Sequence, residues 1–147
     1  MKKKAEEIKL DIKTLGYYID RALCVMIKGL NKELKLRGLT FQHSDFTIMK
    51  VLNETHGLSQ TQLAKILGKE KTGIGRSLYT LEKDGYVVRT RVNRCTNQVC
   101  LTEKGKEIMP VLNEIANKVT DKAFTGFSEK KRLEMMKNLT LIYQNSL

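Results

Sequence analysis

The residues of this chain best suited to bind a partner are cationic, and their excess over acidic residues is largest in the middle of the sequence. The chain has 27 Lys and Arg against 16 Asp and Glu, a net charge of +11. Residues 58–105 carry nine of the basic and four of the acidic residues, the strongest bias along the chain. Such a balance favours a polyanionic partner, because arginine and lysine can bond to base edges and phosphates.

The middle segment predicts two short helices joined by a tight turn. Ser59 and Gln62 form a start signal for a helix over residues 60–67, and Gly68 suits its left-handed end. A second amphipathic helix is predicted over residues 70–84. Two helices joined in this way form a helix-turn-helix, whose second helix enters the major groove of DNA. The outward residues of that helix, our candidate DNA contacts, are Lys71, Thr72, Gly73, Gly75, Arg76, Ser77 and Thr80.

Within this helix the candidate residues divide by chemistry. Arg76 is the first choice for base readout, because its planar fork can pair with guanine O6 and N7. Lys71 and Thr72, at the helix start, suit phosphates. Gly73 and Gly75 each destabilise the helix by about 0.8–1 kcal/mol relative to alanine, so the presence of glycine at both positions requires a reason. Close approach to the duplex is one, and the alternatives are tight helix–helix contacts or simply a weak helix.

A basic hairpin follows the two helices. Residues 86–92 and 96–101 are β-branched runs separated by a short polar segment, which predicts two paired strands and a wing. A narrow minor groove attracts arginine, so the wing supplies further candidate DNA contacts, and the alternative for each is an ordinary solvated charge. These residues are Arg89, Arg91 and Arg94.

Helices are predicted on both sides of this unit. Apolar residues between positions 8 and 34 recur at helical spacing along a stripe too long for a small domain to cover, so part of it is expected to pack on a second subunit. Ser44 is expected to cap the next helix, Thr102 the helix after the wing, and Ser128 the last one.

The predicted fold is mainly α with a small β wing, with about six helices and two or three short strands. Residues 38–105 are assigned to a winged helix-turn-helix DNA-binding domain. Residues 1–37 and 106–147 are assigned to a helical dimerisation region. The expected assembly is a homodimer on double-stranded DNA.

The succession of motifs resembles the MarR family of bacterial transcription regulators, over essentially the whole chain. The SQTQLAKILG stretch at 59–68 alone would fit many helix-turn-helix proteins, and the more specific pieces are residues 81–87 and 101–105. The motifs are GLT at 38–40, LSQTQLAKILG at 58–68, LEKDGYV at 81–87 and LTEKG at 101–105.

The resemblance implies a triangular homodimer that reads a pseudo-palindromic site, with repression relieved by a small ligand or by oxidation. It also implies that Arg76 matches a frequent recognition-helix arginine. The sequence departs from the family in the wing, where the family's Asp-x-Arg is replaced by Asn93 and Cys95 with Arg94 between them. Whether Arg94 or Arg91 replaces the missing contact is left open at this stage.

Three cysteines without CxxC spacing argue against a disulfide framework and a zinc ribbon. Cys24 falls on the apolar side of the first helix, where a small buried side chain is the first expectation and a redox sensor the alternative. Cys95, beside Arg94, has the more activated setting for oxidation, and Cys100 is expected to pack at the end of the wing.

A small-molecule effector is a further expectation, whereas no metal or cofactor is expected. His43 and His56 lack the spacing of a metal site. The candidate pocket, between the first two helices and the winged domain, could equally be dimer core. Its residues are Tyr17, Tyr18, Met26 and Met49.

Other classes of function find less support. No GxSxG, Walker or HExxH motif is present, so an enzyme is not expected. The alternative to a DNA-binding regulator is a winged helix used only for protein interaction, which should expose apolar rather than cationic residues. A membrane-surface partner is not expected, because the long apolar stripe of the first helix is better explained by a dimer. A membrane span is not expected either, because no apolar run is long enough, and the predicted location is the cytoplasm.

Overall fold

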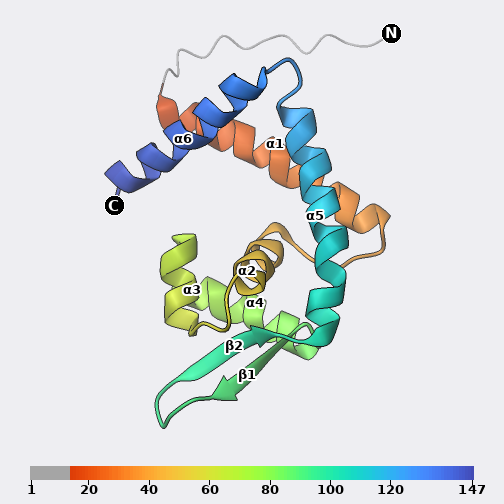
Figure 1. Ribbon diagram of the computed structural model, residues 1–147, viewed down its shortest axis with the longest axis vertical. Coiled ribbons are helices and arrows are strands. Elements are labelled where there is room, and N and C mark those ends of the chain that lie inside the picture. Colours follow the sequence, from red (N-terminus) through yellow and green to blue (C-terminus); the bar gives the residue numbers. More distant parts are fainter. Residues whose placement is uncertain (1–13) are drawn as a thin grey trace.

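The computed structural model describes residues 14–147 as a helical protein with one small sheet (Figure 1). The predicted fold class is confirmed. The start of the predicted first helix, residues 8–13, lies outside the described residues. The elements are α1 (Leu15–Leu36), α2 (His43–Asn53), α3 (Gln60–Leu67), α4 (Lys71–Lys83), β1 (Val87–Arg91), β2 (Asn97–Leu101), α5 (Glu103–Ala123) and α6 (Glu129–Asn145).

Local capping residues fix most of these boundaries. The Ser59 hydroxyl accepts from the Gln62 amide at 3.1 Å, and the Gln62 carboxamide accepts from the Ser59 amide at 2.8 Å. Thr102 and Ser128 cap α5 and α6 as predicted. Gly68 ends α3 with φ +59°, a left-handed conformation that glycine adopts without strain.

The predicted cap of α2 is wrong. Gln42, not Ser44, occupies the cap position, and its backbone N–H donates to the buried Asp45 carboxylate at 2.9 Å. That bond satisfies one backbone donor and places a negative charge at the positive end of the helix. The helix therefore begins at His43, and Ser44 lies inside its first turn.

One apolar core holds the helix-turn-helix and the wing together. The helix predicted over residues 70–84 is amphipathic: Ile74, Leu78 and Leu81 are the buried stripe of α4, and they pack with Leu63 of α3. The two strands pair antiparallel, and their buried residues join the same core. Leu58 forms an isolated bridge with Val99, which ties the start of α3 to the wing. The orientation of α4 is thus fixed by side chains from three elements.

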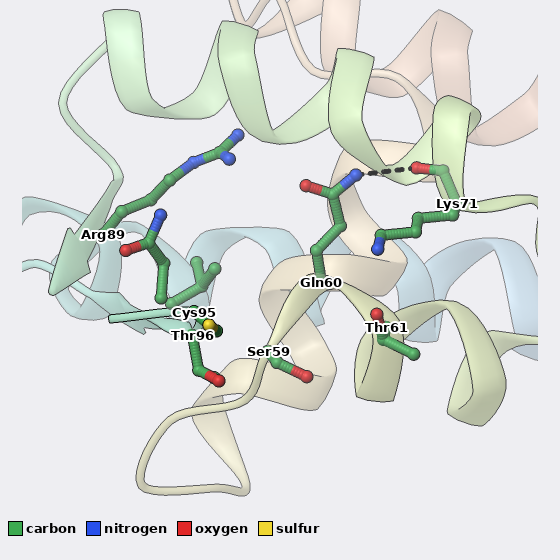
Figure 2. A pocket seen from close by; sticks show the side chains of 9 residues that line it. Ser59, Gln60, Thr61, Lys71, Arg89, Cys95 and Thr96 are labelled. Carbon is green, nitrogen blue, oxygen red and sulfur yellow. Dashed lines mark hydrogen bonds between the residues drawn. The ribbon is translucent and has the colours of Figure 1, made fainter. Parts of the chain in front are cut away.

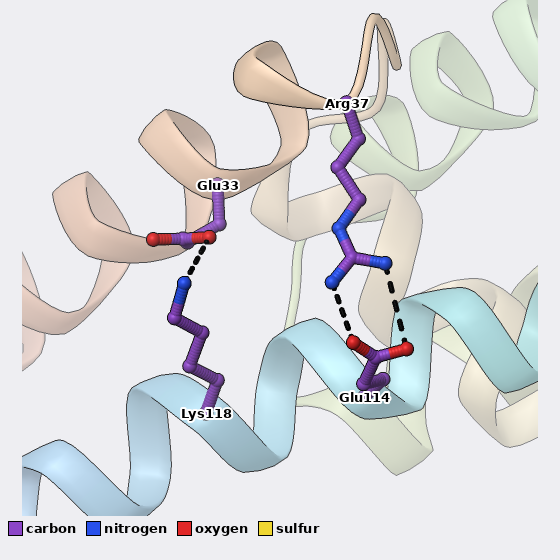
Figure 3. A network of polar contacts seen from close by, with 4 residues as sticks. All are labelled: Glu33, Arg37, Glu114 and Lys118. Atoms are coloured by element: carbon purple, nitrogen blue, oxygen red, sulfur yellow. Dashed lines mark hydrogen bonds and ion pairs between the residues drawn. The ribbon is translucent and has the colours of Figure 1, made fainter.

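Helix α5 runs from the end of β2 away from the wing and lies against the other long helix, α1 (Figure 1). Two ion pairs join them, as Figure 3 shows. Arg37 binds Glu114 through two nitrogens, the shorter contact being 2.6 Å, and Lys118 binds Glu33 at 2.9 Å. These pairs are solvent-exposed, so they orient the helices more than they stabilise the fold.

Helix α6 has no buried residue in the protomer. An ion pair between Arg132 and Asp121 ties it to α5 at 3.0 Å. Its apolar side chains are exposed, with Leu133 and Met136 each 54% accessible. Within residues 14–147, no helix combines the length and apolar composition that crossing a membrane requires.

Candidate nucleic-acid interface

The outer face of α4 carries a cationic and polar set of side chains. Thr72, Arg76 and Thr80 are exposed on the side opposite the buried stripe, and Lys71 is exposed at the start of the helix. Within the part of the chain that the structure describes, neither Lys71 nor Arg76 pairs with a carboxylate. Both cations are therefore available to an anionic partner.

Tyr79 also lies on this outer face and was missed by the sequence reasoning. Its side chain is 68% exposed, three residues after Arg76. The helical period alone could have placed it there. A tyrosine in this position offers an aromatic face and a hydroxyl beside the arginine.

The two glycines of α4 have different surroundings. A Cβ atom at Gly73 would meet nothing within 4 Å, so this position is open to the outside. A Cβ at Gly75 would lie 2.7 Å from Nε2 of Gln60. The explanation in terms of a helix–helix contact therefore applies to one glycine only: Gly75 makes room for a contact between helices, and Gly73 has no such neighbour.

Ser77 is not an outward residue, contrary to the prediction. It is half-buried, and its hydroxyl donates to Ser44 Oγ of α2 at 3.3 Å. The reason is geometric, because Ser77 lies beside Ile74 and Leu78 on the side of α4 that faces α2.

The tip of the wing is ordered by its own side chains. Asn93 Oδ1 accepts from the Cys95 amide at 2.9 Å, which closes a turn. The Arg91 guanidinium donates to the carbonyls of Asn93 and Arg94, at 3.3 and 2.9 Å. Asn93 thus orders the hairpin at the position where the family resemblance implies an aspartate. Arg91 holds the loop, and Arg94 is exposed at the tip.

Arg89 has a different position from the other two wing arginines. Its Nε lies 3.2 Å from Glu82 Oε2 of α4, and its side chain is 27% exposed. It borders a cleft of about 290 Å³ between the start of α3, the start of α4 and the wing (Figure 2). The polar residues that line this cleft are Ser59, Gln60, Thr61, Lys71, Arg89, Cys95, Thr96 and Asn97.

The four predicted pocket residues do not share one cavity. Met49 of α2 is completely buried in the core, and Tyr18 is 58% exposed on α1. Tyr17 contacts Tyr18 edge to face and Arg21 through its ring. Met26 alone lines a hollow, of about 430 Å³, between α1 and α5.

The cysteines differ from expectation at one position. Cys24 is exposed in the protomer, where a buried position was expected, because it lies away from the face of α1 that carries Leu30 and Leu34. Its Sγ faces Asp20 Oδ1 at 4.0 Å. Cys95 is exposed at the wing, and Cys100 is half-buried with its thiol directed to the His56 carbonyl at 3.7 Å.

His43, the first residue of α2, is half-buried. Burial, with a smaller effect from the charge of Lys69, lowers the pKa of this imidazole below its ordinary value. No cluster of His, Cys, Asp and Glu within residues 14–147 could hold a metal ion.

Comparisons with known proteins place this arrangement among regulators. No protein-family model matches the chain. SarZ of Staphylococcus epidermidis, an HTH-type transcriptional regulator, is 29% identical over 112 residues, which are 69% of this chain and 74% of that protein. SarZ of Staphylococcus aureus is 26% identical over 130 residues, 83% of this chain and 86% of that protein.

Solved structures give the same result. A MarR transcriptional regulator from Methanosarcina mazei superposes with a TM-score of 0.82 at 26% identity, over 93% of this chain and 92% of that one. CouR of Rhodococcus jostii, a transcriptional repressor solved on a 23-mer DNA duplex, superposes with a TM-score of 0.79 at 23% identity, over 88% and 92% of the two chains. The resemblance to the MarR family read from the motifs is therefore confirmed, and the chain has the fold of the MarR-family winged-helix transcription regulators.

Proposed function

We propose that this protein is a sequence-specific transcription repressor that binds double-stranded DNA as a homodimer. The observation that carries the proposal is the exposed surface of α4, where Lys71 and Arg76, which pair with no carboxylate among residues 14–147, flank the open position Gly73. A helix of this kind can enter the major groove and bring an arginine to guanine. A protein-interaction module would expose apolar side chains in the same place, so DNA is the better-supported partner.

In this proposal each cation has a distinct role. Arg76 reads a base edge, and Lys71 with Thr72 binds the backbone phosphates at the start of the helix. Arg94 enters the minor groove from the tip of the wing, because Arg91 is engaged with the loop and Arg89 with Glu82.

The homodimer is proposed from the apolar side chains that the protomer leaves in water. They lie on the two helices farthest from the wing, and monomeric proteins rarely leave so much apolar surface exposed. A second copy would bury them and would place two α4 helices on one duplex. These residues are Leu15, Tyr18 and Leu23 of α1, and Leu133, Met136, Leu139 and Tyr143 of α6.

An organic anion is the proposed effector. The hollow between α1 and α5 has apolar side chains from Val25, Met26 and Val119, and lysines at its border, Lys32 and Lys122 among them. The CouR structure with p-coumaroyl-CoA supports an effector of this general kind. Calorimetric titration with aromatic carboxylates, compared between the wild type and Met26→Trp, tests whether the hollow is the site.

The function is tested by selecting genomic fragments with the purified protein, with and without peroxide and reductant. We expect recovery of a pseudo-palindromic sequence, and any effect of oxidation would direct attention to Cys95. Arg76→Ala should bind that sequence about 5- to 150-fold less tightly and with relaxed base choice.

Lys130→Ala is the matched control for the selection, because it removes one exposed cation from α6, far from the interface. It should behave as the wild type. Recovery of random fragments by the wild type, or equal binding by the wild type and Arg76→Ala, would refute the proposed reading of DNA.

A further inference from the structure

Gln60, the first residue of α3, reaches across to the start of α4. Its side-chain Nε2 donates to the backbone carbonyl of Lys71 at 2.9 Å (Figure 2). Lys71 is the first residue of α4. The bond therefore joins the beginnings of the two helices of the helix-turn-helix, at the end of α4 that precedes Arg76.

Gly75 is the position that admits this contact. In an α-helix the carbonyl of residue 71 faces the amide of residue 75, so a side chain that binds this carbonyl passes close to the Cα of residue 75. A Cβ at Gly75 would lie 2.7 Å from Gln60 Nε2, closer than real Cβ contacts allow. With alanine there, the Gln60 carboxamide must move and give up its bond to Lys71.

Gln60 itself is held in place by its neighbours. The reciprocal bonds between Ser59 and Gln62 fix the first turn of α3 on both sides of it. The Leu58–Val99 bridge attaches the same turn to the wing. Gln60 thus lies in a turn that is attached to the wing, and its side chain holds the start of α4.

We propose that Gln60, with Gly75 as its matching partner, is a positioning residue that sets the rotation of α4 against α3 and thereby determines which bases Arg76 can read. Gln60 does not itself read a base. This inference rests on the proposed function. It assigns the specificity of the interface in part to a residue outside α4.

The contact is tested first without DNA, by a thermal-unfolding cycle of Gln60→Ala, Gly75→Ala and the double variant. Gly75→Ala should raise the unfolding temperature more in the Gln60→Ala background than in the wild type, because only there does the added methyl group cost no hydrogen bond. Gly73→Ala is the control, since its effect should be the same in both backgrounds. Equal effects of Gly75→Ala in the two backgrounds would overturn the pairing of Gln60 with Gly75.

The role in specificity is tested with the selected operator and a scrambled duplex. Gln60→Ala should lower the ratio of their affinities about fivefold, the equivalent of one net hydrogen bond, with binding to the scrambled duplex unchanged. Gly75→Ala should lower the ratio to the same extent, and the double variant no further. Gln60→Met, which fills the space without an amide donor, should match Gln60→Ala.

Other outcomes contradict the inference in recognisable ways. Equal losses on both duplexes would mean that Gln60 binds the phosphate backbone directly. A further loss when Gly75→Ala is added to Gln60→Ala would mean that Gly75 itself faces DNA. A wild type without base preference would remove the proposed function, whereas the unfolding cycle would still decide whether Gln60 and Gly75 form a pair.

Discussion

Replacing Gly73 by alanine should make the protein more stable and a poorer DNA binder. Glycine inside a helix costs about 0.8–1 kcal/mol relative to alanine. At Gly73 the new methyl group meets nothing within 4 Å, so no steric cost offsets that gain. For a chain of this size the unfolding temperature should rise by about 2–4 °C.

The same methyl group lies on the face of α4 that is proposed to enter the major groove. There it holds the helix away from the bases, three residues before Arg76. If the arginine loses its base pair contact, affinity for the operator falls by about 1–3 kcal/mol, or about 5- to 150-fold. Stability and affinity should therefore move in opposite directions.

Two measurements decide the case: thermal unfolding at one fixed protein concentration, and fluorescence anisotropy with the operator. The concentration is fixed because the stability of a dimer depends on it. Gly29→Ala is the matched control. Gly29 is in α1, far from the wing, and its new methyl group would contact Val119 of α5 at an ordinary 3.7 Å. It should raise stability and leave DNA affinity unchanged. Unchanged DNA binding by Gly73→Ala would refute the idea that this face approaches the duplex.

Three other substitutions test the remaining interface and the pH dependence. Arg94→Ala should weaken binding to every sequence and reduce the slope of log affinity against log salt by about one unit, as seen in a salt titration. Tyr79→Ala should weaken operator binding without changing the unfolding temperature, because the side chain is already 68% exposed. Since the pKa of His43 is lowered in the fold, the neutral imidazole is favoured there, and stability present above its ordinary pKa of 6.5 is lost as the pH falls through the lower folded-state value. His43→Gln should flatten that loss in unfolding curves measured from about pH 7 to pH 5.

The parts of the fold that the sequence predicted well are those set by local chemistry. The cap of α3 and its glycine end depend on Ser59, Gln62 and Gly68, which are close together in the chain, and all three act as expected. The buried stripe of α4 follows from one helical period. The wing follows from two β-branched runs around a polar turn.

The parts that were predicted poorly depend on contacts between distant segments. Ser77 faces α2 because Ser44, 33 positions away, lies opposite. The purpose of Gly75 becomes visible only when Gln60 of another helix is placed beside it. Cys24 was expected to be buried because the whole stripe of the first helix was treated as one face, whereas the buried residues of α1 are Leu30 and Leu34, on a face from which Cys24 points away.

The three wing arginines show how a charge count can mislead. Glu82 offsets the charge of Arg89, so this residue adds little to the attraction for phosphates. Arg91 is engaged as well, but with neutral carbonyls, so its positive charge remains at the tip beside Arg94. Arg91 therefore has two separable roles, one in the order of the loop and one in the electrostatic potential.

Arg91→Ala and Arg91→Lys separate these roles. Alanine removes both the charge and the loop bonds, so it should weaken binding to all sequences and flatten the salt dependence. Lysine keeps the charge but cannot reproduce the two bonds of a planar guanidinium, so the salt slope should stay while amide exchange in residues 92–96 becomes faster. A lysine variant with a wild-type exchange rate would show that the Arg91 bonds do not order the wing. A flattened salt dependence of DNA binding by Arg91→Lys would show that the positive charge at position 91 acts only when the loop bonds of the guanidinium hold it in place.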